Sequence, residues 1–395
     1  MVKDNSKLFI LVLLGMLTAF GPFVTDMYLP SLPSMGEYFS TSSSMVQLGL
    51  TTSMIGLAVG QIFFGPLSDR YGRRIPLQVA MWLFIVSTIF CLFAQNIQQF
   101  VAFRLIQGIA GAGGIVIARS IATDKFSGKD LAKMLAIIGA INGIAPVVAP
   151  IICGGWQGIF IILLVLGVLL LIGCMRFRES LPAENRLATK WADTFNSFKV
   201  VLRNKQYVCY VLQLAFAQGV LFAYIASSPF IIQQHYGYSP FAFSICFSIN
   251  AIAIGGAAAF SVKFRRPANG TLVGCMGMLI FSLLECSALA LGCSFWIYEL
   301  LLIAVLFMMG MTFTTSTALA MECERTNAGT ASALLGAVCF SFGGIVSPLV
   351  GIGNILVSTG VIFVICSFCS LSCILLALGR RRTKLYFAFS TSQKR

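Results

Sequence analysis

Long apolar segments divide this chain at regular intervals, and they constrain its fold more than any other feature of the sequence. A helix needs about 20 residues to cross a hydrocarbon layer of ~30 Å. On that criterion the predicted spans are 8–30, 46–67, 76–94, 99–121, 133–152, 158–175, 207–233, 241–261, 271–292, 295–320, 329–350 and 358–379. The segments therefore predict a multi-pass membrane protein.

The basic residues are placed in alternate gaps between these segments. All but two of the 27 Lys and Arg residues lie at the termini, in the even-numbered gaps or, as Lys133 does, at the edge of such a gap, and the odd-numbered gaps hold none. Basic residues that flank membrane segments stay on the cytoplasmic side. We therefore predict an all-α membrane protein with twelve transmembrane helices in two six-helix halves and with cytoplasmic N- and C-termini. The two exceptions, Arg104 and Arg119, fall within a span.

Composition excludes several other classes of protein. The chain is 58% hydrophobic and only 10% charged, whereas soluble domains are about 25% charged. Its net charge of +14 is spread over short loops, so we expect contact with the lipid bilayer and not with nucleic acid. The 13 cysteines lie mainly in apolar runs, and His235 is the only histidine. We expect no metal site, no cofactor and no enzyme activity.

The longest polar stretch separates two groups of six predicted spans, an arrangement found in secondary transporters. Within that stretch Trp191, Phe195, Phe198 and Leu202 recur at helical spacing, which fits either an amphipathic helix on the inner membrane surface or a flexible tether. The predicted divisions are an N-terminal half at 1–175, a cytoplasmic linker at 176–206, a C-terminal half at 207–380 and a basic tail at 381–395.

Asp26, Arg104, Arg119 and Glu285 are charged residues that fall within predicted spans. Each costs roughly 2.5–3.5 kcal/mol at the centre of a membrane helix. Asp26 and Arg104 lie at matching depths, so we expect them to pair if their helices are neighbours. The pair is either structural or proton-coupling, because an Asp26 that alternates between Arg104 and water changes its proton affinity with conformation. Neither Arg119 nor Glu285 is assigned a role.

Two motifs carry a resemblance to a known family. The loop after the second span runs from Gly65 to Arg74 in the pattern Gly-x-Leu-x-Asp-Arg-x-Gly-Arg-Arg, which resembles the signature loop of the major facilitator superfamily. Its Asp69 is placed to accept from helix N-terminal amides. Span four, from Arg104 to Gly114, is similar to that superfamily's drug:proton antiporter motif.

Further strings narrow the resemblance. Residues 25–33 and 223–230 are similar to the bicyclomycin-resistance (Bcr/CflA) branch of drug exporters. The fifth span resembles the antiporter motif of that helix but lacks its usual Gly-Pro dipeptide. The residues of this span that carry the likeness are Gly139, Gly143, Pro146 and Pro150.

The resemblance implies a monomeric proton-coupled antiporter that exports amphipathic drugs or related small molecules across the bacterial inner membrane. Asp26 and Arg104 would couple the protons, and Tyr28, Gln107 and Tyr224 would line the substrate cavity. The implied conformational latch on the inner face comprises Gly65, Asp69, Arg70, Gly72, Arg73 and Asp124. The alternative is a narrow-specificity proton-coupled exporter of a metabolite such as an amino acid or a siderophore.

Overall fold

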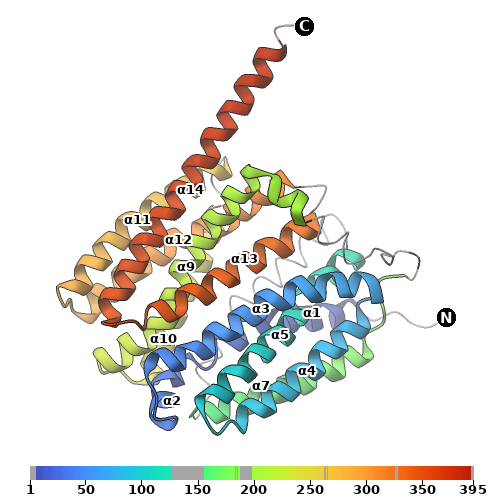
Figure 1. Cartoon of the computed structure of the whole chain (residues 1–395), viewed down its shortest axis with the longest axis vertical. Helices are drawn as coiled ribbons and strands as arrows, with labels where there is room; N and C mark the ends of the chain where they lie inside the picture. Colours follow the sequence, from blue (N-terminus) through green and yellow to red (C-terminus); the bar gives the residue numbers. More distant parts are fainter. Residues whose placement is uncertain are drawn as a thin grey trace. The chain divides into compact units, whose positions relative to one another are not determined.

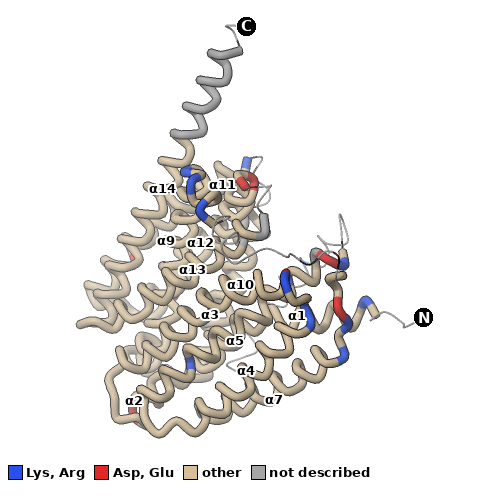
Figure 2. Tube along the Cα trace, turned by 45° about the vertical axis from the view of Figure 1, so that its right-hand side comes forward, with Lys and Arg blue, Asp and Glu red and all other residues tan. Residues whose placement is uncertain are grey.

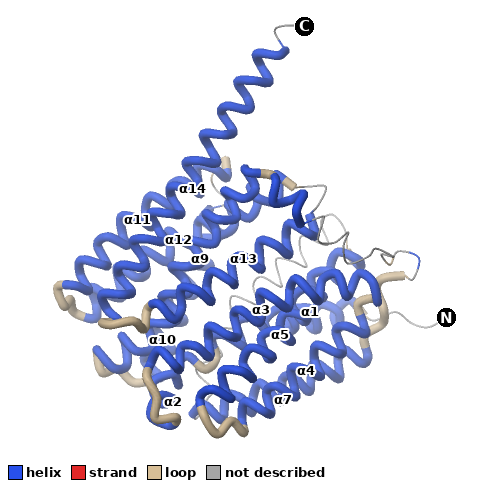
Figure 3. Tube along the Cα trace, viewed as in Figure 1, coloured by secondary structure: helices blue, strands red, loops and turns tan. Residues whose placement is uncertain are grey.

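The computed structural model describes residues 6–126, 155–182, 184, 186, 198–261, 264, 266–324 and 328–392, and within these ranges every regular element is a helix (Figure 1, Figure 3). The elements are α1 (Lys7–Asp26), the 3₁₀ turn η1 (Leu29–Ser31), α2 (Leu32–Tyr38), α3 (Ser43–Tyr71), α4 (Arg74–Leu92), α5 (Ile97–Lys125), α7 (Gly155–Arg176), α9 (Lys205–Phe230), the π-helix η4 (Ile231–His235), α10 (Pro240–Ser261), α11 (Pro267–Ala290), α12 (Phe295–Cys323), α13 (Ala328–Leu349) and α14 (Ile355–Ser392).

The described helices follow the predicted spans closely. In the described ranges ten helical segments are long and apolar enough to cross a membrane, and Ala333–Leu349 is a shorter apolar helix. Every predicted span coincides with a described helix except 133–152, which lies outside the described residues together with Gly139, Gly143, Pro146 and Pro150. In the linker, residues 198–203 are helical, while Trp191 and Phe195 lie outside the described ranges.

The first predicted span is not one continuous helix. α1 ends at Asp26, and the chain continues through η1 into α2. Pro30 explains the break, because it has no N–H to donate to the carbonyl of Asp26 four residues earlier. The last carbonyls of α1 therefore need partners from elsewhere in the molecule.

Contacts group the chain into two compact units. The first unit comprises Met1–Thr194, Ile225–Ala251 and Ser347–Ile352, and the second comprises Phe195–Tyr224, Ile252–Val346 and Gly353–Arg395. In the first unit α5 packs against α1, α3 and α4, and α7 packs against α4. In the second unit α11 packs against both α12 and α14.

Two glycines allow α3 and α5 to touch backbone to backbone. A Cβ on Gly108 of α5 would lie 2.2 Å from the carbonyl oxygen of Ser53, and one on Gly56 of α3 would lie 2.3 Å from that of Leu105. Small residues at such crossings give membrane helices their closest packing. This crossing fixes the register of α5 and, with it, the position of Arg104.

Charges and apolar side chains are distributed as a bilayer requires. Arg70, Arg73, Arg74 and Arg176 of the first unit lie at one end of α3, α4 and α7 (Figure 2). Large apolar side chains remain exposed along the helices, including Trp82 on α4. An apolar exterior of this kind suits contact with lipid.

Candidate functional site

The centre of the first unit is a buried arginine whose guanidinium reaches α1 and α3. Arg104 of α5 is fully buried, and its Nη2 donates to the carbonyl oxygen of Val24 at 2.6 Å and to Oγ of Ser53 at 3.1 Å. Its Nη1 donates to Oε1 of Gln107 at 2.5 Å, and its Nε donates to the carbonyl oxygen of Gly49 at 3.4 Å. Every nitrogen of this side chain is hydrogen-bonded, which is what a buried charge requires.

Aromatic rings and a second polar residue complete this Arg104 cluster. The guanidinium carbon lies 4.4 Å from the ring centroid of Tyr28 and 5.7 Å from that of Phe160, distances at which the ring faces attract a cation. Gln107 extends the hydrogen-bond network to α4, because its Nε2 donates to Oγ1 of Thr88 at 2.7 Å. The structure thus brings together three predicted residues, Arg104, Gln107 and Tyr28.

Asp26 does not form the predicted ion pair in this structure. Its Oδ1 accepts from Oγ1 of Thr25 at 2.6 Å, and among the described residues no cationic group lies within ion-pair distance of it. Arg104 instead caps the open carboxyl end of α1 at Val24, two residues before Asp26. That carbonyl is one of the four that α1 cannot satisfy internally, and a cation suits a helix C-terminus.

Three of the six predicted latch residues form a connected group, and the other three lie outside it. Arg73 lies between α3 and α4, and its side chain donates to Asp69, to Oγ of Ser68 at 2.8 Å, and to both carboxylate oxygens of Asp124 at 2.9 and 3.3 Å. Arg70 is not part of this group, since its guanidinium lies over the ring of Tyr71 at 5.4 Å. The loop thus ties α3, α4 and α5 together through one arginine.

Two further latch residues differ in what they contribute. Gly72 adopts a φ of +86°, which favours glycine, whereas Gly65 is an ordinary helical position that contacts Val116. The neighbouring carboxylates favour the charged form of Arg73. Burial disfavours the charged form, but the hydrogen bond to Asp124 and the charges of Asp69 and Asp124 outweigh it, so the pKa of Arg73 lies above its usual value.

The amides that begin α4 are capped by Glu179 and not by Asp69, so that expectation was wrong. Glu179 follows α7, and its carboxylate accepts from the backbone N–H of Arg73 at 2.8 Å and of Arg74 at 3.1 Å. A Cβ on Gly72 would lie 2.4 Å from Glu179 Oε2, so only glycine permits this approach. Sequence reasoning missed Glu179 because 105 residues separate it from Arg74.

Polar contacts also join the loop after α1 to η4, the π-helix that extends α9. Nε2 of Gln233 donates to the carbonyl oxygen of Pro30 at 3.1 Å, and Nε2 of Gln47 donates to that of Ala226 at 3.1 Å. Single π-helical turns inside helices occur often at functional sites. No local sequence pattern indicated this π-helical turn, and all four residues belong to the first unit.

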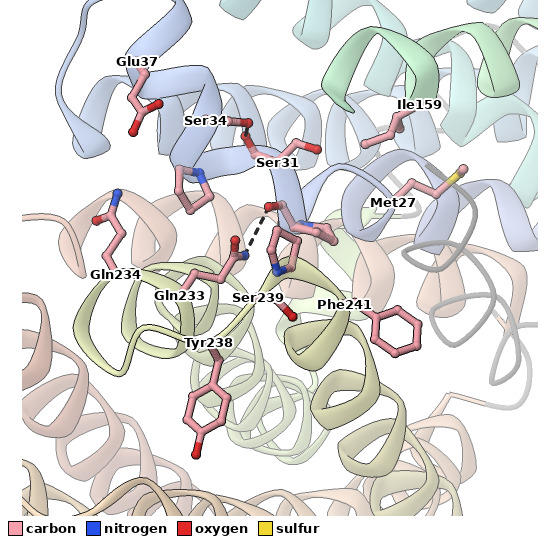
Figure 4. A pocket seen from close by; sticks show the side chains of 13 residues that line it. Met27, Ser31, Ser34, Glu37, Ile159, Gln233, Gln234, Tyr238, Ser239 and Phe241 are labelled. Atoms are coloured by element: carbon pink, nitrogen blue, oxygen red, sulfur yellow. Dashed lines mark hydrogen bonds between the residues drawn. The ribbon is translucent and has the colours of Figure 1, made fainter. Parts of the chain in front are cut away.

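A cavity of about 620 Å³ opens beside these contacts within the first unit (Figure 4). Met27, Ser31 and Glu37 line it on the side of η1 and α2, and Gln233 and Phe241 line it on the side of η4 and α10. The Gln233–Pro30 hydrogen bond joins two of the residues that line it (Figure 4). The cavity combines apolar surface with one carboxylate and several neutral polar groups, a lining suited to an amphipathic molecule.

Two other predictions concern Tyr224 and the absence of a metal site. Tyr224 is buried on α9 in the second unit, and its approach to Tyr28 and Gln107 stays a prediction. Among the described residues no group of three or more His, Cys, Asp or Glu side chains is arranged to hold a metal ion.

Comparison with known proteins gives a consistent result. Residues 11–348 match the family model of the Major Facilitator Superfamily. The chain is 36% identical over 369 residues to an uncharacterized MFS-type transporter, YdgK, of Bacillus subtilis, covering 89% of this chain and 90% of that one. It is 29% identical over 371 residues to a bicyclomycin resistance protein homolog of Haemophilus influenzae, covering 89% and 90% of the two chains. It is 26% identical over 352 residues to multidrug resistance protein D of Escherichia coli, covering 85% and 86%.

Solved structures agree at the level of the fold. The E. coli xylose transporter XylE, in a partially occluded inward-open conformation, matches with a TM-score of 0.75 at 14% identity over 94% of this chain and 97% of that one. The human organic anion transporter MFSD10 matches with a TM-score of 0.70 at 15% identity over 95% and 100%. From the family model, the relatives and the shared helical fold, the chain belongs to the major facilitator superfamily of membrane transporters.

Proposed function

We propose that this protein is a proton-coupled antiporter that exports amphipathic drugs or related small molecules across the bacterial inner membrane by alternating access. The motifs of span four and the relatives named for bicyclomycin and multidrug resistance support this function. The proposal includes twelve spans in two halves, at 1–175 and 207–380, with both termini cytoplasmic. It also includes a monomeric state.

The observation that carries the proposal is the position of Arg104 relative to Asp26. Arg104 donates to the carbonyl of Val24, and Asp26 lies two residues further along the same helix end, where Thr25 is its only hydrogen-bond partner among the described residues. A small movement of α1 against α5 exchanges the Val24 carbonyl for the Asp26 carboxylate at the guanidinium. The proton affinity of Asp26 then differs between the two arrangements, because a cation beside a carboxylate favours its ionised form.

Substrate and proton compete through this exchange. A proton that reaches Asp26 neutralises it and leaves Arg104 on α1, whereas loss of the proton lets Asp26 engage Arg104 or a cationic substrate. Tyr28 and Gln107 both contact Arg104 directly and would respond to that event, although neither lines the 620 Å³ cavity. Tyr224 is proposed to face them from the second half.

The Arg73 network acts as the latch in this mechanism. Arg73 joins α3, α4 and α5 through Asp69 and Asp124, so the inner ends of these helices move together while the network holds. Opening requires these charge-assisted hydrogen bonds to break or to rearrange. Gly72 and Glu179 keep the loop in the conformation that presents Arg73.

The test is proton release from detergent-solubilised protein when a panel of lipophilic cations is added. We expect release from the wild type and none from Asp26→Asn, since the variant has no proton to displace. Glu322→Gln removes an exposed carboxyl on α12 and serves as the matched control, which should behave as the wild type.

Drug tolerance of cells that lack their own exporters provides the second readout. Wild-type protein should raise tolerance and Asp26→Asn should not, at equal expression. Release of protons from Asp26→Asn would contradict the role of Asp26. Wild-type protein that is folded but silent toward every drug would favour the narrow metabolite exporter instead.

A further inference from the structure

The lining of the cavity beside η4 has a polar side and an apolar side. Its volume of about 620 Å³ is within the range of pockets that hold small organic molecules. Figure 4 shows Glu37 and Gln234 on one side of the cavity and Met27, Ile159 and Phe241 on the other. Such a lining matches a molecule that has a polar group at one end and an apolar body at the other.

The polar side of the cavity carries a negative charge. Among the described residues that line the cavity, Glu37 is the only one with a charged side chain. It is exposed, and no hydrogen bond or ion pair joins its carboxyl group to another described residue. An exposed glutamate is ionised at neutral pH. Its carboxylate is therefore available to a ligand.

The segments that form the cavity hold no lysine or arginine near it. Residues 8–69, which include η1 and α2, contain neither, and the same is true of residues 206–262, which include η4 and α10. Ile159 is on α7, whose one basic residue, Arg176, lies 17 positions later and so about 25 Å along the helix. The chain's only histidine, His235, is not among the described lining residues. The charge that balances Glu37 must then come from the ligand.

The apolar side of the cavity offers one exposed ring above a closed wall. Phe241, at the start of α10, is 61% exposed, whereas Met27 and Ile159 are buried in the wall. A ligand that packs between them removes apolar surface from water, which favours binding. The face of the Phe241 ring also attracts a nearby cation. This side therefore suits the hydrocarbon part of an organic cation.

Two hydrogen bonds hold the walls of the cavity in place. Gln233 Nε2 donates to the carbonyl oxygen of Pro30 at 3.1 Å and thereby joins η4 to η1. Ser34 Oγ donates to the carbonyl oxygen of Ser31 at 2.9 Å, within the turn that leads from η1 into α2 (Figure 4). Because the walls are already ordered, a ligand loses less affinity to the ordering of the protein.

The cavity begins next to Asp26 in the chain. Met27, which lines its apolar side, directly follows Asp26, and Glu37 lies across the cavity from Met27 (Figure 4). Glu37 belongs to the first gap between predicted spans and Gln234 to the seventh, and both gaps are odd-numbered. In the proposed orientation such gaps face outward. A cation that leaves Asp26 toward the outside would then meet a second carboxylate.

We propose that this cavity is a second binding site, for an amphipathic organic cation that carries a single charge. The charged group lies beside Glu37, and the apolar body lies on the opposite side, against Met27 and Phe241. Binding here needs neither Asp26 nor proton exchange. Only the further assignment, that the bound cation is exported substrate on its way out, rests on the proposed function.

Equilibrium dialysis of the Asp26→Asn protein tests the site, because this background lacks the other proposed carboxylate. The probe is naphthylmethyltrimethylammonium, and naphthylmethanesulfonate carries the opposite charge on the same rings. We expect Glu37→Gln, added to Asp26→Asn, to weaken binding of the cation about fivefold at low salt but not binding of the anion. High salt should remove the difference, since it screens exposed charges. Glu322→Gln, in the same background, should bind the cation as the parent does.

A second variant tests the apolar side. Phe241→Ala should weaken binding of both probes, because the ring contacts the body that the two share. Unchanged binding of both would contradict the placement of that body.

Two other results would overturn the site itself. One is equal affinity for the cation with and without Glu37→Gln at low salt. The other is a folded Asp26→Asn protein that does not bind the cation at all. Neither depends on proton exchange, so a wild type that releases no protons when drugs are added would contradict the proposed function alone.

Discussion

Arg104 in the first unit and Glu285 in the second are both fully buried ionisable side chains, yet their surroundings differ. Each nitrogen of Arg104 donates a hydrogen bond, and two aromatic rings face its guanidinium. Among the described residues, neither carboxyl oxygen of Glu285 has a hydrogen-bond partner. The protein therefore surrounds the charge of Arg104 with fixed hydrogen-bond acceptors and ring faces, whereas Glu285 receives no such support from the described residues.

Close helix packing excludes water from both places. Gly108 brings α5 onto α3 beside Arg104, and Gly360 brings α14 onto α11 beside Glu285. The difference thus lies in the partners and not in the depth of burial. Arginine cannot be deprotonated under ordinary conditions, so it must be given partners, whereas a carboxyl group can accept a proton instead.

Replacing each buried group by methionine should produce the largest contrast. Arg104→Met leaves the Val24 carbonyl, Ser53 and Gln107 without their donor, and we expect the free energy of unfolding to fall by about 3 kcal/mol. Glu285→Met removes a polar group that has no partner, so stability should be unchanged or higher. Thermal midpoints in one detergent measure both. Equal losses in the two variants would show that burial alone decides the outcome.

The glycine crossings provide the next largest effect. Gly108→Ala places a Cβ 2.2 Å from the Ser53 carbonyl oxygen, so α3 and α5 must separate and the Arg104 cluster loosens. We expect a loss of about 2 kcal/mol, within the range for overpacked cores. Gly158→Ala on α7 is the matched control, because its Cβ would meet no atom within 4 Å. A Gly108→Ala protein as stable as this control would contradict the close crossing.

The sequence predicted most of the helices because membrane spans depend mainly on local hydropathy, and it identified Arg104 because charge is rare in such segments. It also identified Arg73 with Asp69 and Asp124, through a motif. It paired Asp26 with Arg104 because the two residues lie at matching depths, whereas in the structure the guanidinium donates to the Val24 carbonyl near the end of α1.

What the sequence could not supply depended on contacts between distant segments. Glu179 caps α4 because the chain after α7 returns to that helix, and no local spacing encodes the return. The π-helix at Ile231–His235 likewise has no periodic signature. Glu285 was recognised as a charge within a span, but its two neighbouring helices reveal that it is unpaired.

The capping carboxylate of the first unit should have a moderate effect. Glu179→Gln keeps the shape of the side chain but weakens its hydrogen bonds to the amides of Arg73 and Arg74, so we expect a loss of about 1 kcal/mol. Amide hydrogen exchange at the start of α4 should accelerate in step. Glu184→Gln, at an exposed position in the same loop, should change neither quantity. Unchanged exchange in Glu179→Gln would mean that the amides have another acceptor.

The smallest loss in the free energy of unfolding should come from removing a neutral hydrogen bond at the cavity. Gln233 and Gln234 are adjacent on the π-helix and both line the cavity, but only Gln233 donates to the Pro30 carbonyl. Gln233→Leu should therefore lower the free energy of unfolding by about 0.5–1 kcal/mol, the usual net value of one hydrogen bond. Gln234→Leu should leave it unchanged, because that side chain is exposed. Equal thermal midpoints for the two variants would mean that the hydrogen bond to the Pro30 carbonyl contributes nothing to the stability of this unit.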